Sequence, residues 1–214
     1  MNATWTDQGH YMVLMNEQRT PEWHAARQGR ITASGVLGCI GYRFCSREEY
    51  ADKLRGRTTT VQNEAMLAGI EYEPFARQQY EHLKQCHVTE VGFMVPKFMP
   101  SIGASPDGLV GDDGMIEIKC PATMYLPLTT PVSARRVDSR GRPFHIWESH
   151  YSQMQMQLAI ADRKWCDYVV YAYETGEFYV ERVRFNRVYW DYLLAHIKSF
   201  ITQLVPDLEP AMSV

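Results

Sequence analysis

The sequence has no long hydrophobic run, no signal-peptide pattern in its first 20 residues and no excess of positive charge. Its 214 residues are 45% hydrophobic, yet no stretch approaches the roughly 18 consecutive apolar residues of a membrane span. Residues 1–20 lack the basic start and the apolar block of a signal peptide. We therefore expect a cytoplasmic protein without a membrane partner, and the chain length suits a single domain over residues 1–214.

The motifs of several common protein classes are also missing. Five cysteines are scattered along the chain and form no CxxC pair, which argues against a disulfide framework or a zinc ribbon. Neither GxxxxGK[ST] nor GxGxxG occurs, which argues against a nucleotide-driven motor or a dinucleotide enzyme. The net charge of −3 and the pI near 6.2 give no global nucleic-acid signature. Any contact with DNA must therefore rest on a local basic surface.

Hydrophobic periodicity and turn residues predict a mixed arrangement of helices and strands. Gly29 separates a helical turn from a second helix capped by Thr32 or Ser34, and Ser46 caps the next helix. Pro74 predicts a kink, or two abutting segments, because it removes a backbone donor and crowds the previous turn. The expected elements are an extended arm or short helix over 1–20, helices over 20–42, 46–56 and 63–85, strands over 87–120, a long loop over 122–147, a helix over 148–162, a hairpin over 164–185 turning at Thr175–Gly176, and a helix over 187–204. This order predicts an α/β or α+β domain with a central mixed β-sheet flanked by helices.

The stretch "SIGASPDGLVGDDGMIEIKC" places charged residues in an otherwise apolar hairpin. Because strand side chains alternate, Glu117 and Lys119 share one face. A two-residue loop would turn Asp107 away from them, whereas a three-residue loop over 112–114 would place it opposite Lys119. We favour the longer loop, because its last residue is left-handed and Gly114 adopts that conformation without steric cost. The sequence therefore predicts that the two carboxylates and the amine project from one face.

Two carboxylates and an amine on one face suit a hard divalent cation. Mg²⁺ prefers oxygen ligands, keeps several waters and usually takes only one or two carboxylates from a protein. A bound metal activates a coordinated water and neutralises the charge of a phosphate, and Lys119 could orient that water, deprotonate it or stabilise the phosphate charge. The residues therefore predict a site for phosphodiester hydrolysis. The alternative is a surface hairpin whose Glu–Lys pair contributes little stability.

Further motifs surround this hairpin in a fixed order. "SPDGLV", "EIKCP" and the later "SQMQMQL" together resemble the phage lambda exonuclease type of viral recombinase nuclease, within the PD-(D/E)xK nuclease superfamily. "EWHAARQGRITAS" is similar to the opening motif of that family, and "GIEYEPFARQQYE" is similar to its helical glutamate motif. The matches run from about residue 22 to residue 160. The resemblance implies a restriction-endonuclease-like PD-(D/E)xK core.

The resemblance also implies roles for residues of the hairpin and the preceding helix. Asp107 and Glu117 would bind the metal, together with the backbone carbonyl of Ile118. Lys119 would act on the attacking water. Glu73 would reach the site from its helix and assist a second metal or its water shell.

Other implied roles concern the lysine and the phosphates. Gln153 would hold the lysine or the scissile phosphate, although Gln157 lies on the same helical face and Gln155 on another. Arg27 and Ser34 would form a pocket for the 5′-phosphate of the degraded strand. A helix start favours an anion and an arginine binds phosphate with two hydrogen bonds, which gives that pocket a physical basis. Arg30 is the alternative to Arg27 in this pocket. The arginines of the long loop could contact DNA phosphates or could simply be solvated; they are Arg135, Arg136, Arg140 and Arg142.

The function implied by the resemblance is a Mg²⁺-dependent 5′→3′ exonuclease, with two metal ions and Mn²⁺ as a substitute. It would degrade the 5′-ended strand of linear double-stranded DNA and leave 3′ single-stranded tails for phage-type recombination. The implied partners are DNA ends, further copies of the chain in a ring-shaped homotrimer, and a phage-type single-strand annealing protein. The alternatives are a structure-specific or restriction-type endonuclease of the same superfamily, and a non-catalytic DNA-end-binding protein.

Overall fold

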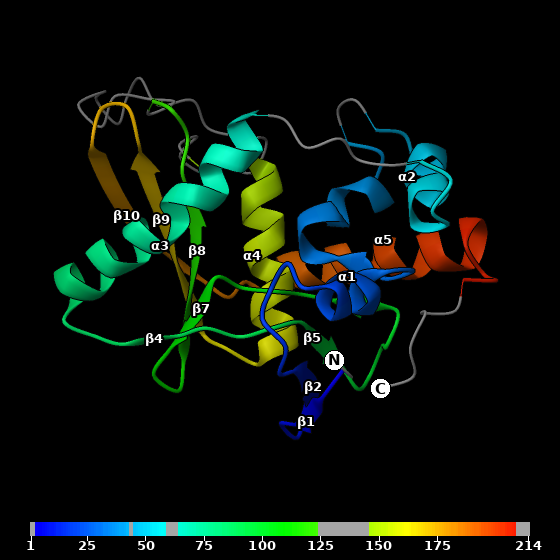
Figure 1. The fold of residues 1–214 in the computed structure, drawn as a ribbon. Helices are drawn as coiled ribbons and strands as arrows, with labels where there is room; N and C mark the ends of the chain where they lie inside the picture. Colours follow the sequence, from blue (N-terminus) through cyan, green and yellow to red (C-terminus); the bar gives the residue numbers. More distant parts are fainter. Residues whose placement is uncertain (1–2, 43–44, 59–63, 124–145, 209–214) are drawn as a thin grey trace.

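A mixed sheet of five strands, in the order β10-β9-β8-β7-β4, forms the centre of the computed structural model (Figure 1). The structure describes residues 3–42, 45–58, 64–123 and 146–208. β8 and β9 are parallel, and the other neighbours are antiparallel. The strands are β4 (Val88–Thr89), β7 (Gly108–Val110), β8 (Gly114–Lys119), β9 (Trp165–Ala172) and β10 (Glu177–Arg184). The predicted mixed sheet and the predicted C-terminal hairpin are confirmed.

Two smaller sheets are formed by short strands near the N-terminus and by short strands that precede the β7–β8 hairpin. β1 (Trp5–Asp7), β2 (Tyr11–Leu14) and β5 (Met94–Pro96) pair in that order, all antiparallel. β3 (Ile31–Thr32) pairs with β6 (Ile102–Gly103) in parallel. The described part of the N-terminal arm is therefore extended, and the alternative of a short helix there is wrong. The pairing of β2 with β5, more than 80 residues away in the chain, holds the arm extended although its own sequence has no clear periodicity.

Capping residues fix the starts of several helices. Ser46 caps the start of α2, as the sequence predicts, and it forms a reciprocal capping box with Glu49. Asn186 caps α5 by accepting a hydrogen bond from the N–H of Tyr189. The α-helices are α1 (Pro21–Arg27), α2 (Arg47–Leu54), α3 (Glu64–Lys84), α4 (Glu148–Ala161) and α5 (Arg187–Leu204). None of these helices is long and apolar enough to span a bilayer, a statement that covers the described residues.

One helix prediction needs correction, and one of the two alternatives for another is excluded. The second N-terminal helix is a 3₁₀ helix, η1 (Ala33–Cys39), and Thr32 makes no side-chain capping bond while Ser34 lies inside it. Pro74 lies within one continuous helix, α3, rather than between two abutting segments. Most of the predicted loop over 122–147, including its four arginines, lies outside the described residues.

The loop of the β7–β8 hairpin lies one residue earlier than predicted. Val110 pairs with Gly114, so the loop is residues 111–113 and its left-handed residue is Gly111, with φ of 53°. Gly114 is needed for another reason, since a Cβ at that position would lie 2.1 Å from the ring of Trp165. The left-handed residue of the loop therefore precedes Asp112 and Asp113 instead of following them.

The conclusion about the hairpin face survives this correction. Gly108 pairs with Ile116, and one further step along the ladder places Asp107 opposite Glu117 rather than opposite Lys119. The predicted and observed registers differ by two residues on β8. Because the side-chain period of a strand is two, Asp107 projects from the same face in both registers.

Helices cover both faces of the central sheet (Figure 1). Ile116 and Ile118 pack with Ala76 and Tyr80 of α3 on one face. Met115, on the other face, belongs to the larger core that also contains buried residues of α4, α5 and η1. The alternation along β8 thus sends isoleucines toward α3 and directs Glu117 to the α4 side.

Candidate active site

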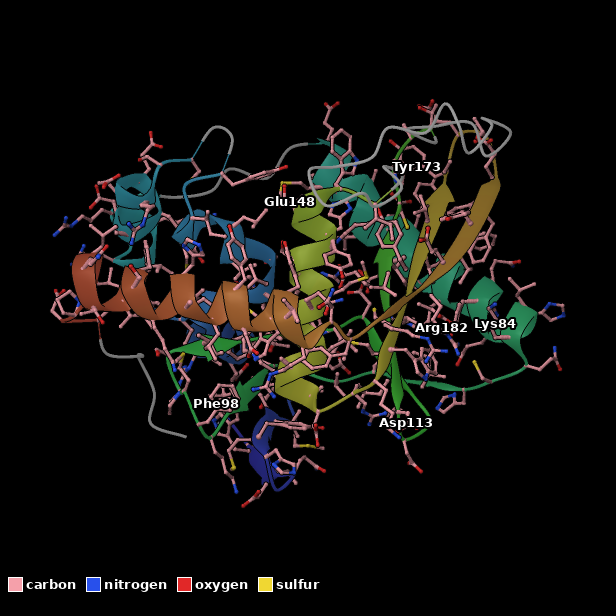
Figure 2. The ribbon with its side chains drawn as sticks, turned by 180° about the vertical axis from the view of Figure 1, so that it is seen from behind. Lys84, Phe98, Asp113, Glu148, Tyr173 and Arg182 are labelled. Atoms are coloured by element: carbon pink, nitrogen blue, oxygen red, sulfur yellow. The ribbon has the colours of Figure 1, made fainter. Side chains whose placement is uncertain are left out.

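The carboxyl end of β8 opens into a cavity of about 620 Å³, which we call the carboxylate cavity. Residues from α3, from the segment before β7, from β8 and from α4 line it. Figure 2 shows Tyr173, which also lines this cavity, at the opposite end of the sheet from Asp113 in the hairpin loop. The residues that the sequence predicts to be catalytic all line the cavity, namely Glu73, Asp107, Glu117, Lys119 and Gln153.

Glu117 is the most tightly held of these side chains. It is 1% exposed, and Lys119 Nζ and Gln153 Nε2 both donate to its Oε1 atom. Gln157 Nε2 donates to Oε2 at 2.7 Å. Because a buried carboxylate needs compensating donors, this set of contacts fixes its orientation as well as its charge. Gln153 therefore contacts the carboxylate, and its predicted partnership with the lysine runs through Glu117.

Asp107 lies beside Glu117 and is tied to the next strand. Its Oδ2 atom accepts a hydrogen bond of 2.6 Å from the backbone N–H of Ile118. Burial raises the pKa of Asp107 well above its usual value, and the Glu117 and Glu73 carboxylates raise it further. The site therefore concentrates negative charge that only partly finds compensation within the protein.

Lys119 supplies the principal positive charge next to these carboxylates. Its side chain is 27% exposed and pairs with Glu117. Burial alone would lower the pKa of the ammonium, but the Glu117 and Asp107 carboxylates outweigh burial and raise that pKa above its usual value. Lys119 is therefore an ammonium group in the metal-free protein, suited to donate hydrogen bonds to a phosphate.

Two arginines hold the glutamate that α3 contributes. Arg19 pairs with Oε2 of Glu73, and Arg77 Nη2 lies 3.1 Å from its Oε1 atom. Arg77, one helical turn further along α3, also pairs with Glu90. No motif pointed to Arg19, which is separated from Glu73 by 54 positions in the chain. Gln157 was also missed as a contact of Glu117, although its helical spacing from Gln153 placed both on one face.

A second cavity, of about 870 Å³, contains both residues of the predicted phosphate pocket, Arg27 and Ser34. We call it the arginine pocket. The Arg27 guanidinium lies 4.1 Å from the ring centroid of Trp23, and burial lowers its pKa to about 10. Arg30, the competing candidate, is 1% exposed and donates to the carbonyls of Ala26 and Pro100. Arg27 is therefore better placed than Arg30 to bind an anion.

The profile of the YqaJ-like viral recombinase domain matches residues 22–164. The chain belongs to this viral recombinase family. It is also 34% identical to an alkaline exonuclease from Laribacter hongkongensis, with 88% of this chain and 94% of that chain covered and a TM-score of 0.71. The crystal structure of that enzyme in complex with dAMP gives a TM-score of 0.72 at the same identity and coverage.

More distant structures share the fold of the viral recombinase family. A phage-related exonuclease from Haemophilus somnus 129PT is 12% identical, covers 84% of this chain and 96% of its own, and has a TM-score of 0.57. A protein from Eubacterium rectale is 13% identical, covers 92% and 89%, and has a TM-score of 0.60. The comparison with curated protein sequences gives no match. The predicted family resemblance and the PD-(D/E)xK type of fold are confirmed.

The donor set of this viral recombinase chain fits a divalent cation. Among the residues that the structure describes, no three His, Cys, Asp or Glu side chains gather as a ready-made metal cluster. Mg²⁺ requires fewer protein ligands than that, because it keeps several waters. Asp107 and Glu117 offer hard carboxylate oxygens. The raised pKa of Asp107 reflects burial first and then the crowding of negative charge, which a cation would relieve. Ile118, whose carbonyl is the third predicted ligand, also lines the cavity.

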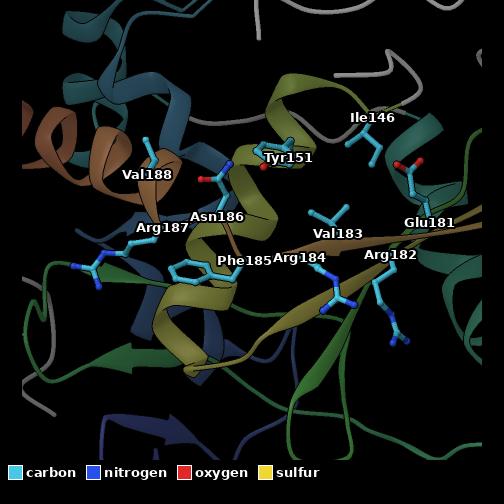
Figure 3. Close-up of a pocket in the computed structure, with 10 residues that line it drawn as sticks. All are labelled: Ile146, Tyr151, Glu181, Arg182, Val183, Arg184, Phe185, Asn186, Arg187 and Val188. Atoms are coloured by element: carbon cyan, nitrogen blue, oxygen red, sulfur yellow. The ribbon is translucent and has the colours of Figure 1, made fainter. Parts of the chain in front are cut away.

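A groove of about 590 Å³ at the junction of β10 and α5 has a different character (Figure 3). Two of its three arginines are already paired: Arg182 binds Asp167 and Arg187 binds Asp191. It shares no lining residue with the carboxylate cavity. The predicted catalytic residues therefore lie at the end of β8, and none of them lines this groove.

Proposed function

We propose that this member of the YqaJ-like viral recombinase family is a Mg²⁺-dependent 5′→3′ exonuclease acting on linear double-stranded DNA. It would degrade the 5′-ended strand and leave a 3′ single-stranded tail for phage-type recombination. One observation carries the proposal: Asp107, Glu117 and Lys119 converge in a cavity whose wall is shared with the arginine pocket. A site for cleavage thus adjoins a site for an anionic strand end.

The proposed roles follow from the contacts within the cavity. Asp107, Glu117 and the carbonyl of Ile118 would hold the cation, with Glu73 serving a second ion or its waters. When bound, the cation supplies an activated water and neutralises phosphate charge. Lys119 would donate to the scissile phosphate or orient the attacking water. Gln153 would keep Glu117 and Lys119 aligned, because it donates to the same carboxylate oxygen that the lysine contacts.

The arginine pocket would bind the 5′-phosphate of the strand being degraded. Arg27 would contribute two parallel hydrogen bonds to the phosphate, and Ser34 would contribute a hydroxyl. The ring of Trp23 packs against the Arg27 guanidinium. Trp23 Nε1 also donates a hydrogen bond of 2.8 Å to the hydroxyl of Ser105, two residues before Asp107. This chain of contacts would keep the strand end at a fixed distance from the metal ligands.

The relatives support the same reaction class. The Laribacter hongkongensis protein is described as an alkaline exonuclease and was crystallised with dAMP, a deoxynucleoside monophosphate. Release of mononucleotides fits that ligand. Assembly as a ring-shaped homotrimer around the duplex, and partnership with a single-strand annealing protein, are further parts of the proposal that rest on the family resemblance. A cytoplasmic location is proposed on the same basis.

Digestion of three labelled substrates tests the proposal. The substrates are linear duplex with 5′-phosphate ends, the same duplex with 5′-hydroxyl ends, and closed circular duplex, each with Mg²⁺ or with EDTA. We expect mononucleotide release from the 5′ label of the phosphorylated linear duplex in Mg²⁺, slower release from the hydroxyl form, and an intact circle. Cutting of the circle would instead indicate an endonuclease, and release from the 3′ label first would contradict the proposed polarity.

A further inference from the structure

Arg19 lies where the carboxylate cavity and the arginine pocket meet. It lines both cavities, together with Met66 and Ile70 of α3. Its guanidinium pairs with Glu73 on the carboxylate side, and its side chain is 42% exposed. Arg27 and Ser34 line the other side of the same boundary. One partly exposed arginine therefore lies between the proposed catalytic carboxylate and a pocket suited to phosphate.

The backbone at Arg19 is strained. Its φ angle is 71°, in the left-handed region that residues other than glycine seldom adopt. Its neighbours hold this turn in place: Gln18 Nε2 donates to the carbonyls of Val91 and Pro106, and Thr20 caps α1. Strained residues that their surroundings hold in place are concentrated at functional sites. The left-handed turn, held by these contacts, directs the Arg19 side chain to the boundary between the cavities.

The pairing of Arg19 with Glu73 is suited to exchange. Glu73 keeps a second partner, because Arg77 Nη2 contacts its other oxygen at 3.1 Å. The departure of Arg19 would therefore leave the carboxylate paired. A partly exposed ion pair also contributes little net stability. A terminal phosphate carries more charge than a carboxylate and accepts two parallel hydrogen bonds from a guanidinium, so it competes well for Arg19.

We propose that Arg19 is a specificity-determining residue that exchanges Glu73 for the 5′-phosphate of a DNA end. Binding of a phosphorylated end would draw the guanidinium toward the arginine pocket and free one oxygen of Glu73 for the cation site. Occupation of the pocket would thereby prepare the carboxylate cavity. The inference rests on the proposed function, since it assumes that the anion bound beside Arg27 is the 5′-phosphate of DNA.

Equilibrium binding in EDTA tests this exchange without cleavage. Fluorescence anisotropy measures the affinity of the full chain for blunt duplexes with 5′-phosphate or 5′-hydroxyl ends. Arg19→Gln should weaken binding of the phosphorylated duplex about tenfold and change binding of the hydroxyl form less than about twofold. Arg19→Gly removes the same side chain but suits the left-handed backbone, so it should lose the preference while keeping the fold. Arg187→Gln, which removes a 75% exposed arginine outside both cavities, should leave the preference unchanged.

Substitution of Glu73, the carboxylate partner of Arg19, gives the more specific test. Glu73→Gln removes the competitor of the phosphate, so it should strengthen binding of the phosphorylated duplex about threefold. That gain should vanish in the Arg19→Gln, Glu73→Gln double variant. A merely structural Arg19 would produce neither the gain nor its loss.

The outcomes separate this inference from the proposed function. If Arg19→Gln and Arg19→Gly both keep the wild-type preference, or if Glu73→Gln gains affinity without Arg19, the exchange is overturned although digestion of linear DNA can still stand. A wild-type protein that binds both ends equally also overturns it. If the wild type binds phosphorylated ends as described but never degrades DNA, the proposed function fails and the role of Arg19 in binding remains.

Discussion

Two buried glutamines of α4 differ in what they touch, and replacing each with leucine separates positioning from stability. Gln157 donates to Oε2 of Glu117 at 2.7 Å, whereas Gln155 donates to the carbonyl of Arg184 and accepts from the N–H of Asn186. Both side chains are 1% exposed or less. The two substitutions are therefore matched in helix, burial and chemistry, and they differ in whether the proposed metal ligand Glu117 is affected.

The expected magnitudes follow from these contacts. Gln157→Leu removes the hydrogen bond to Glu117, worth about 1.5–3 kcal/mol, and a long one of 3.5 Å to the carbonyl of Ser105, which adds little. It also removes the buried Oε1 atom of Gln157, which has no partner among the described residues and costs about 1 kcal/mol. The net loss of stability should be about 1 kcal/mol, or a fall in Tm of roughly 2–4 °C. Loss of a group that orients a metal ligand typically lowers activity or metal affinity about 10–100-fold.

Gln155→Leu should give the opposite pattern. It leaves a backbone carbonyl and a backbone N–H without their partners, which should lower stability by about 1–3 kcal/mol. Nuclease activity per folded molecule should stay within about twofold of wild type. Thermal unfolding followed by circular dichroism, together with initial rates of nucleotide release below the unfolding range, measures both quantities. Equal losses of activity in the two variants would refute the assigned role of Gln157.

Two buried acidic residues, Asp107 and Asp167, carry the remaining predictions. Burial and neighbouring carboxylates raise the folded-state pKa of Asp107, so its ionisation destabilises the metal-free fold as pH rises above the unfolded pKa of about 3.9. Asp107→Asn should therefore abolish cleavage and yet stabilise the protein in EDTA by about 0.5–2 kcal/mol at pH 8. In thermal melts this gain in stability should shrink toward pH 4. A lower Tm at pH 8 would contradict this reasoning. Asp167, 1% exposed, accepts from Tyr80 and Arg182, so Asp167→Asn should lower stability by about 2–4 kcal/mol in urea unfolding while activity per folded molecule is retained.

Local signals in the sequence predicted much of the fold. The capping box at Ser46 and the apolar period of α5 are local, because the residues that fix each helix end lie within one turn of it. The 3₁₀ form of residues 33–39 was missed, since the same residues fit an α-helical pattern and packing against α2 and α4 decides between the two. The extended arm was ambiguous because its partner strand, β5, is distant in the chain.

The candidate site shows the same division. Glu117 and Lys119 could be paired from strand alternation, and the period of two brought Asp107 to their face even though the loop was placed one residue too late. Gln157 was visible only as a helical neighbour of Gln153, because its contact with Glu117 depends on how α4 lies across β8. The ion pair of Arg19 joins segments 54 residues apart and depends on a left-handed turn, for which the sequence has no glycine signal.

The catalytic role of Lys119 is the central claim, and one paired measurement tests it most directly. Lys119→Ala and the control Lys164→Ala, which removes a 73% exposed lysine, are compared with wild type for binding and digestion of 5′-phosphorylated linear duplex in Mg²⁺. We expect Lys119→Ala to bind the duplex and release mononucleotides at least about 100-fold more slowly, with Lys164→Ala unchanged. Digestion by Lys119→Ala at the wild-type rate would contradict the claim.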